Sequence, residues 1–296
     1  MLRWRLVSGT VMVTLLVALC WLDARAERPG IYLAPLVVVL CVLATEEILR
    51  MFRARGGNPL AWALYVGTLL PVLASCLPIF WPVSPIGPLG WLAGGLAAGL
   101  VVAFMGEMGR YGRTEEATGK TTTNLAMAAL SLLYVGGLLG LLIQLRLSPG
   151  TGEVNPGLAP LLSLIFVVKM SDTGQYFVGR RFGKRKLAPV LSPGKTWEGA
   201  IGGIGISAFV TATLLSLYLE SMTGLAGWCR VLVYCLLLSL AGLVGDLAES
   251  LLKRDAGVKD SSSWLPGLGG VLDVLDSLLL AGPMAYLCWV LGLVGP

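Results

Sequence analysis

Histidine is absent from this chain, and charged residues are scarce. The 296 residues include no histidine, and Asp, Glu, Lys and Arg together make up only 13%. The first absence excludes histidine acid–base catalysis, histidine zinc sites and haem ligation by histidine. The six cysteines are scattered and none forms a CxxC pair, so neither a disulfide framework nor a cysteine zinc site is indicated.

Apolar residues dominate what is present, at 56% of the chain with a mean hydropathy of +0.80. A stretch of about 20 apolar residues is long enough to span a bilayer as a helix. Such stretches occur at 6–22, 31–50, 61–83, 86–108, 122–145, 157–179, 199–219, 229–252 and 270–294. The sequence therefore predicts an all-α polytopic membrane protein of about nine transmembrane helices, forming one integral membrane domain over residues 1–296. We expect the first span to be retained, although the segment ALCWLDARA does not exclude signal-peptide cleavage.

Lysine and arginine fall mainly on one side of this topology. Most of the 22 lie at the N-terminus or in the segments after the second, fourth, sixth and eighth spans. Cytoplasmic loops carry an excess of these residues, so the pattern predicts a cytoplasmic N-terminus and a C-terminus on the opposite side.

A polar turn interrupts the sixth span. Lys169 and Asp172 are three residues apart, so on a helix they share a face and can neutralise each other. One interpretation is an internal ion pair that holds two helices together. Ser171, Thr173, Gln175 and Tyr176 make the same turn polar, which favours a water-filled cavity instead.

A basic segment, residues 180–186, follows this span and precedes SPGKTWEG at residues 192–199. Basic juxtamembrane runs commonly fix topology or contact anionic lipid. In the second motif, Ser-Pro-Gly predicts a tight turn with free amide groups, and Lys195 and Thr196 follow directly, which suits a phosphate group. Thr196 and Glu198 are equally typical of a helix start.

Five acidic residues lie within or beside the last two apolar stretches. Ionisable groups at membrane depth cost several kcal/mol and normally face a partner, a cavity or an ion. Asp246, Glu249, Ser250 and Lys253 follow helical spacing along one face, and Asp273 and Asp276 share another, with Asp260 in the connecting segment. Two acidic faces that meet can hold a divalent cation. The alternative is charge pairing of Lys253 and Arg254 with Asp246 and Glu249, which leaves Asp273 and Asp276 unexplained.

Together these motifs resemble the CTP-dependent phosphatidate cytidylyltransferase (CDP-diacylglycerol synthase) family. The similarity is dense between about residues 165 and 280, and before about residue 120 only the hydropathy fits. The family's C-terminal signature is matched at Ser250, Lys253, Arg254, Lys259, Asp260, Pro266, Gly267, Gly269, Gly270, Asp273 and Asp276. The segments 171–199 and 199–203 fit as well. The resemblance assigns the catalytic part to residues 160–296 and leaves 1–120 as weakly matching spans.

Two positions depart from the family pattern. Leu268 stands where the family usually has histidine, and Val274 stands where it usually has arginine. Without that arginine, Asp273 and Asp276 lack a neutralising charge. We expect a cation, Lys253 or Lys259 to take its place, or the activity to be altered.

The resemblance implies transfer of CMP from CTP to phosphatidate, giving CDP-diacylglycerol and pyrophosphate for phospholipid biosynthesis. It implies an active site at the cytoplasmic side of the C-terminal helices. The implied catalytic residues are Asp246, Lys253, Asp260, Asp273 and Asp276. The implied substrate-binding residues are Asp172, Tyr176, Ser192, Lys195, Thr196, Ser250, Arg254, Lys259, Gly269 and Gly270. Asp246 and Asp273 are the implied ligands of Mg²⁺, and a second cation nearby is compatible with this set.

The expected partners are CTP, phosphatidate and the lipid bilayer, with no nucleic acid and with a homodimer as one option. The expected location is the cell membrane, in a bacterium the inner membrane. Two other classes stay open: a CTP-dependent kinase or cytidylyltransferase of another lipid, and an inactive or transport-type relative that has lost the usual histidine and arginine.

Overall fold

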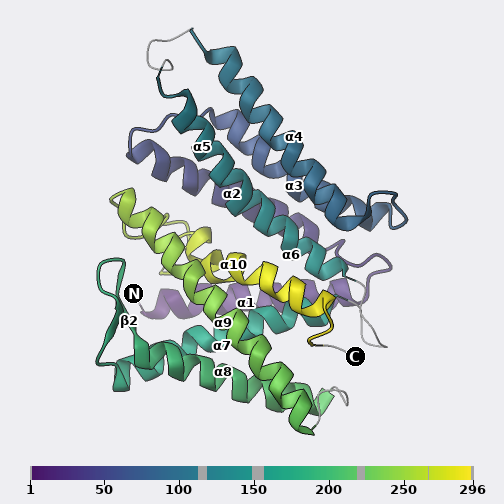
Figure 1. Cartoon of the computed structure of the whole chain (residues 1–296), viewed down its shortest axis with the longest axis vertical. Helices are drawn as coiled ribbons and strands as arrows, with labels where there is room; N and C mark the ends of the chain where they lie inside the picture. The colour runs from purple at the N-terminus through teal and green to yellow at the C-terminus, as the bar shows by residue number, and fades with distance from the viewer. Residues whose placement is uncertain (1, 113–118, 149–156, 219–223, 266, 295–296) are drawn as a thin grey trace. The chain divides into compact units, whose positions relative to one another are not determined.

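The computed structural model describes residues 2–112, 119–148, 157–218, 224–265 and 267–294, and helices make up most of them (Figure 1). The helices are α1 (Leu2–Ala24), α2 (Leu33–Ala54), α3 (Ala61–Phe80), α4 (Gly87–Arg110), α5 (Thr121–Ser131), α6 (Leu138–Leu147), α7 (Leu158–Phe182), α8 (Trp197–Tyr218), α9 (Gly224–Asp255) and α10 (Val271–Val290). A π-helical stretch, η1 (Leu132–Gly137), joins α5 and α6 into one rod. Each apolar stretch predicted from the sequence is thus mostly helical in its described part, with non-helical residues at some ends.

Six helical segments of the described chain are long and apolar enough to cross a membrane. They are Val7–Ala24, Ala61–Phe80, Gly87–Arg110, Thr121–Leu147, Gly224–Asp255 and Val271–Val290. Large apolar side chains on α4, among them Phe104 and Met105, are exposed, as expected where lipid replaces water. The chain is therefore a multi-pass membrane protein. The count of nine spans stays a prediction, because α2, α7 and α8 are not among the six.

The chain divides into two compact units. The first comprises Met1–Leu147 and Leu252–Val274, and the second comprises Ser148–Leu251 and Leu275–Pro296. Helices α9 and α10 each contribute residues to both units. The sequence analysis predicted one domain over residues 1–296, with weakly matching spans at 1–120 and the catalytic part at 160–296. This division stays a prediction.

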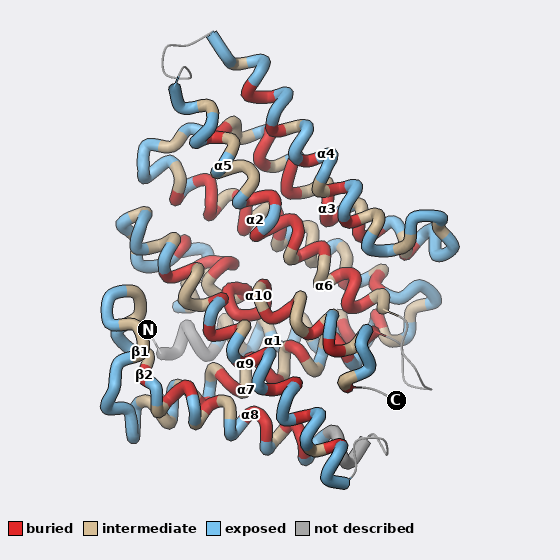
Figure 2. The backbone as a smooth tube through the Cα atoms, in the orientation of Figure 1, coloured by how far each residue is buried: buried red, intermediate tan, exposed pale blue. Residues whose placement is uncertain are grey.

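In the first unit, α3 packs against α2, α4 and the α5–η1–α6 rod, and buried residues follow these helices (Figure 2). Small residues let the backbones approach closely. A Cβ atom added at Gly99 of α4 would lie 2.6 Å from the Gly67 carbonyl oxygen of α3. One added at Gly136 of η1 would lie 2.6 Å from the Thr68 carbonyl oxygen. Close backbone packing of this kind is how helices associate where water supplies no driving force.

In the second unit, α7 packs against α8 through glycines of the segment 199–203. A Cβ atom added at Gly203 would lie 2.6 Å from the Ser171 carbonyl oxygen. A polar cluster also joins three helices of this unit. The buried Tyr234 hydroxyl of α9 lies 2.7 Å from Ser163 Oγ of α7 and accepts a hydrogen bond from Trp289 Nε1 of α10 at 3.3 Å.

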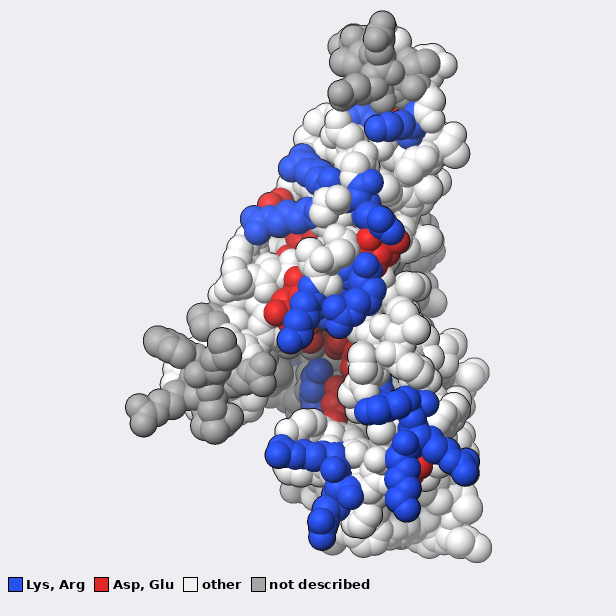
Figure 3. Space-filling view, turned by 90° about the vertical axis from the view of Figure 1, so that its left-hand side faces the viewer, with Lys and Arg blue, Asp and Glu red and all other residues white. Residues whose placement is uncertain are grey.

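A short antiparallel hairpin, β1 (Lys186–Ala188) and β2 (Ser192–Thr196), joins α7 to α8. The all-α prediction did not include it. Lysine and arginine side chains are numerous on the face shown in Figure 3. The basic segment predicted before SPGKTWEG is exposed at Arg180, Arg181, Lys184, Arg185 and Lys186.

A buried ion pair ties the ends of α1 and α6 together in the first unit. Arg146 Nε lies 2.7 Å from Asp23 Oδ2, and the two side chains are 3% and 0% exposed. The Asp23 carboxylate also accepts hydrogen bonds from the amides of Gly30 and Tyr32, both at 3.0 Å. Asp23 therefore fixes the segment that leads from α1 to α2.

Replacing Arg146 with Met should leave the Asp23 carboxylate buried without its counter-charge. Removing one partner of a buried pair typically costs about 3–5 kcal/mol of stability. We expect a clearly lower melting temperature of the detergent-solubilised protein, measured by thermal unfolding. The control is Arg55→Met, which breaks an exposed pair with Asp255 and should leave melting unchanged. Equal melting of both variants would contradict a structural role for the buried pair.

Candidate active site

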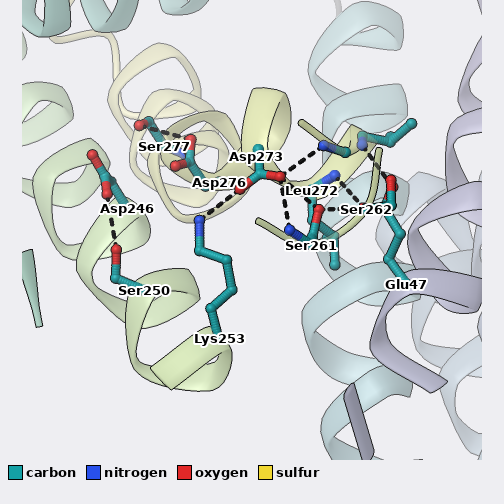
Figure 4. A network of polar contacts seen from close by, with 12 residues as sticks. Glu47, Asp246, Ser250, Lys253, Ser261, Ser262, Leu272, Asp273, Asp276 and Ser277 are labelled. Carbon is teal, nitrogen blue, oxygen red and sulfur yellow. Dashed lines mark hydrogen bonds and ion pairs between the residues drawn. The ribbon is translucent and has the colours of Figure 1, made fainter. Parts of the chain in front are cut away.

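Asp273, the third residue of α10, is the centre of a polar network in the first unit (Figure 4). Its Oδ1 lies 2.6 Å from Lys253 Nζ of α9. Its Oδ2 accepts hydrogen bonds from the amide and hydroxyl of Ser261, at 3.0 and 2.8 Å, and from the Gly270 amide at 2.7 Å. With side chains only 13% and 11% exposed, Lys253 and Asp273 form a largely desolvated pair. Such a charge-assisted pair is stronger than an exposed one.

Lys253 is thus the positive partner of Asp273 in the absence of an arginine at position 274. The sequence analysis named Lys253 as one group that could take the place of the arginine, and that role stays a prediction. Other predicted residues of this unit, Arg254, Lys259 and Asp260, are exposed. Pro266 of the predicted signature lies outside the described residues.

Glycines shape the segment that enters α10. Gly269 has φ +93°, which is strained for any residue with a side chain. A Cβ atom added at Gly270 would overlap Ser261 Oγ and the Glu47 carboxylate. The predicted role of these glycines, close approach of the backbone to a ligand, stays a prediction. The structure shows them making room for the protein's own polar groups.

Glu47 of α2 is a residue that the sequence analysis missed. It is fully buried, and its carboxylate accepts four hydrogen bonds in the first unit. The donors are Ser261 Oγ at 2.9 Å, Ser262 Oγ at 2.7 Å, and the amides of Val271 and Leu272, both at 2.8 Å. An acidic residue inside an apolar span was the available signal.

In the second unit, Lys195 and Asp246 come together. Lys195 Nζ of β2 lies 2.7 Å from Asp246 Oδ2 of α9, and Ser250 Oγ lies 3.4 Å from Asp246 Oδ1. The Asp246 side chain is 31% exposed, so it is paired and still accessible. The hairpin therefore delivers the predicted phosphate-binding lysine to a predicted metal-ligand carboxylate.

The predicted ion pair between Lys169 and Asp172 also forms in this unit, with 3.6 Å between Lys169 Nζ and Asp172 Oδ2. Both side chains keep substantial exposure, at 41% and 32%. The exposed Tyr176 hydroxyl accepts a hydrogen bond from Arg180 at 2.9 Å. Asp276 is buried, and its Oδ1 accepts from the Ser277 hydroxyl at 3.0 Å. The water-filled cavity proposed for this turn stays a prediction.

The end of the SPGKTWEG motif is a helix start, as one of its two interpretations predicted. Thr196 Oγ accepts the Gly199 amide at 3.1 Å and α8 begins at Trp197. The Glu198 carboxylate accepts the amides of Lys184 and Arg185, at 3.0 and 3.2 Å. The hydrogen bond from the Lys184 amide is the main cause that lowers the pKa of Glu198. Ser192 is half-buried opposite Ala188 in the hairpin.

The donor chemistry of the predicted metal ligands fits Mg²⁺. Within the described residues, no group of three or more His, Cys, Asp or Glu could hold a metal ion. Mg²⁺ does not need one, since it usually binds one or two carboxylates and keeps waters and substrate phosphates as its other ligands. Asp246 and Asp273 supply hard oxygen atoms of this kind, each beside a lysine.

Comparison with known proteins extends the similarity over the whole chain. The model of the cytidylyltransferase family matches residues 3–291. A Haemophilus influenzae protein named phosphatidate cytidylyltransferase is 47% identical over 154 residues, 51% of each chain. Proteins of the same name from Brucella melitensis and Mycobacterium tuberculosis are 34% and 32% identical over 289 residues. These alignments cover 97% and 95% of this chain, and 92% and 81% of the relatives.

Replacing Gly270 with Ala should disrupt the entry to α10, because the new methyl group overlaps Ser261 Oγ and the Glu47 carboxylate. Overpacking of this kind costs about 1–3 kcal/mol. We expect a lower melting temperature in thermal unfolding. Gly109→Ala in α4 is the matched control, because nothing lies within 4 Å of its added Cβ atom. Native-like melting of Gly270→Ala would show that this packing is not tight.

Proposed function

The chain belongs to the cytidylyltransferase family, and from this premise we propose that it transfers CMP from CTP to phosphatidate, giving CDP-diacylglycerol and pyrophosphate. The observation that carries the proposal is the similarity over nearly the whole chain to proteins named phosphatidate cytidylyltransferase. These names do not favour the alternatives of a lipid kinase, an enzyme for another lipid, or an inactive or transport-type relative.

The proposed chemistry is a nucleotidyl transfer without a protein nucleophile. A phosphate oxygen of phosphatidate forms a bond to the α-phosphorus of CTP, and the bond from that phosphorus to the β-phosphate bridging oxygen breaks. Pyrophosphate leaves with the electron pair. Because the attacking group is already an anion, little general-base help is needed, and catalysis consists mainly of positioning and charge neutralisation. A chain without histidine is suited to such a reaction.

The lysines are the proposed phosphate-binding groups. Lys195 and Lys253 are each held by a carboxylate, at 2.7 and 2.6 Å, so their ammonium groups have fixed positions before substrate arrives. Arg254 and Lys259 are exposed, and we propose that they contact a triphosphate or a lipid head group. Together these groups would neutralise charge that builds up as pyrophosphate leaves.

Mg²⁺ is the proposed cofactor, with Asp246 and Asp273 as its ligands and room for a second cation, and when bound it would screen the charge of the triphosphate. Asp260 and Asp276 are proposed as supporting carboxylates. The proposed substrate contacts are Asp172, Tyr176, Ser192, Thr196, Ser250, Gly269 and Gly270. For Thr196 and Gly270, the bonds and packing described above suggest that the role is to shape the backbone.

The distribution of lysine and arginine supports a cytoplasmic N-terminus, nine spans and an active site facing the cytoplasm, where CTP is found. We further propose the cell membrane as the location, in a bacterium the inner membrane. A homodimer and the absence of a nucleic-acid partner stay expectations.

Membranes that contain the native chain should convert labelled CTP, with Mg²⁺ and phosphatidate, into a CTP-derived lipid and pyrophosphate. Asp273→Asn should reduce turnover about 10²–10³-fold, as removal of one preorganised charge in an active site often does. Asp255→Asn, at an exposed position, is the matched control and should retain turnover. No product from the native chain, under conditions in which a curated relative is active, would refute the proposed function.

Lys195→Met tests the proposed contact between the hairpin and CTP. Loss of one charged hydrogen-bond donor typically costs about 1.5–3 kcal/mol, so the KM for CTP should rise at least about tenfold. Lys186→Met removes an exposed lysine from the same hairpin and should leave the KM unchanged. Equal effects of the two substitutions would indicate a general electrostatic effect of the basic segment.

A further inference from the structure

Glu47 lies in the N-terminal half of the chain, far in sequence from every motif assigned to the reaction. It is fully buried in α2, and all four of its described hydrogen-bond donors belong to residues 261–272. A buried carboxylate is costly unless it is bonded in this way, so its position calls for an explanation beyond packing.

Glu47 completes the start of α10. In a capping box, the side chain before the helix bonds an amide of the first turn, and the third helical residue bonds back to the amide before the helix. Asp273 makes the second of these bonds, to the Gly270 amide at 2.7 Å. Gly270 has no side chain to make the first. Glu47 replaces it by accepting the amides of Val271 and Leu272, both at 2.8 Å.

Ser261 links the two carboxylates. Its hydroxyl oxygen lies 2.9 Å from Glu47 Oε2 and 2.8 Å from Asp273 Oδ2. A hydroxyl has one proton to donate, so the two carboxylates share this donor and Ser261 donates to one of them at a time. Ser262, in contrast, bonds Glu47 at 2.7 Å and has no described bond to Asp273.

We infer that Glu47 is a positioning residue for Asp273, acting through Ser261 and the first turn of α10. This inference rests on the proposed function, because it concerns a carboxylate assigned to the reaction. The network holds Asp273 Oδ2 with three donors and leaves Oδ1 facing Lys253 Nζ at 2.6 Å (Figure 4). Glu47 thereby determines which oxygen of Asp273 is available for chemistry.

Glu47→Gln keeps the size of the side chain but replaces one acceptor oxygen with an NH₂ group. That group would face the hydrogen-bond donors that the carboxylate now accepts from. Supporting residues of metal ligands typically affect activity about 10–100-fold, and we expect a fall of that size in kcat with little change in the KM for CTP. Ser261→Ala should have a similar effect, and the double variant should be no worse than Glu47→Gln, because both act through one path.

Glu46→Gln is the matched control. Glu46 is the preceding residue of the same helix, and it bonds Arg50 and Tyr65. It should retain native turnover and native hydrogen exchange. Ser262→Ala, which removes a bond to Glu47 alone, should affect kcat less than Ser261→Ala.

Hydrogen exchange at single-residue resolution provides a readout that needs neither substrate nor metal. In Glu47→Gln the amides of Val271 and Leu272 should exchange faster, and so should those of Ser261 and Gly270, which bond Asp273. Faster exchange at Val271 and Leu272 alone, with native turnover, would show Glu47 to be only a helix cap and would overturn the inference.

If Glu47→Gln does not fold, the kcat of Ser261→Ala tests the inference. A native kcat in Ser261→Ala would overturn it. Failure of the native chain to form product counts against the proposed function instead. In that case exchange at Ser261 and Gly270 still decides whether Glu47 holds Asp273.

Discussion

The first turn of α10 contains amide groups that no carbonyl of the same helix can reach. In an apolar environment each amide without a hydrogen-bond acceptor costs several kcal/mol, so neighbouring residues must supply acceptors for these groups. Asp273 takes the Gly270 amide and Glu47 takes those of Val271 and Leu272. This solution fixes α2, the segment around Ser261 and the ammonium group of Lys253. The hydrogen bonds that cap the start of α10 therefore also hold the carboxylate of Asp273 that is proposed to take part in the reaction.

Several ionisable groups in the described part of this apolar chain form close ion pairs, and exposure separates two kinds of pair. Asp23 and Arg146 are almost completely buried and fasten chain segments. Lys195 and Asp246 are paired equally closely, but their side chains are 16% and 31% exposed. A fully buried pair suits stability, whereas a paired but accessible one can exchange its partner for a ligand. Lys195 and Asp246 belong to the motifs on which the resemblance to the family rests.

Local patterns in the sequence predicted what local physics determines. The apolar stretches became helices, Asp246, Ser250 and Lys253 lie along α9 as their spacing required, and Thr196 caps α8. Contacts between distant segments were not predictable. Glu47 meets Ser261 across 214 positions, and Asp23 meets Arg146 across 123, and no periodicity encodes such a distance. The hairpin was missed because its strands of three and five residues are too short to show alternation.

Helix α9 contains 32 residues, which corresponds to a length of about 48 Å. The hydrocarbon core of a bilayer is about 30 Å thick and needs about 20 helical residues. A straight α9 perpendicular to the membrane would therefore extend roughly a dozen residues beyond the hydrocarbon, and the ionisable residues Asp246, Glu249, Lys253 and Arg254 all lie in its last ten positions. With the proposed site at this end of α9, the nucleotide would not need to enter the hydrocarbon. It would stay in water, and the lipid substrate would present its head group at the same depth.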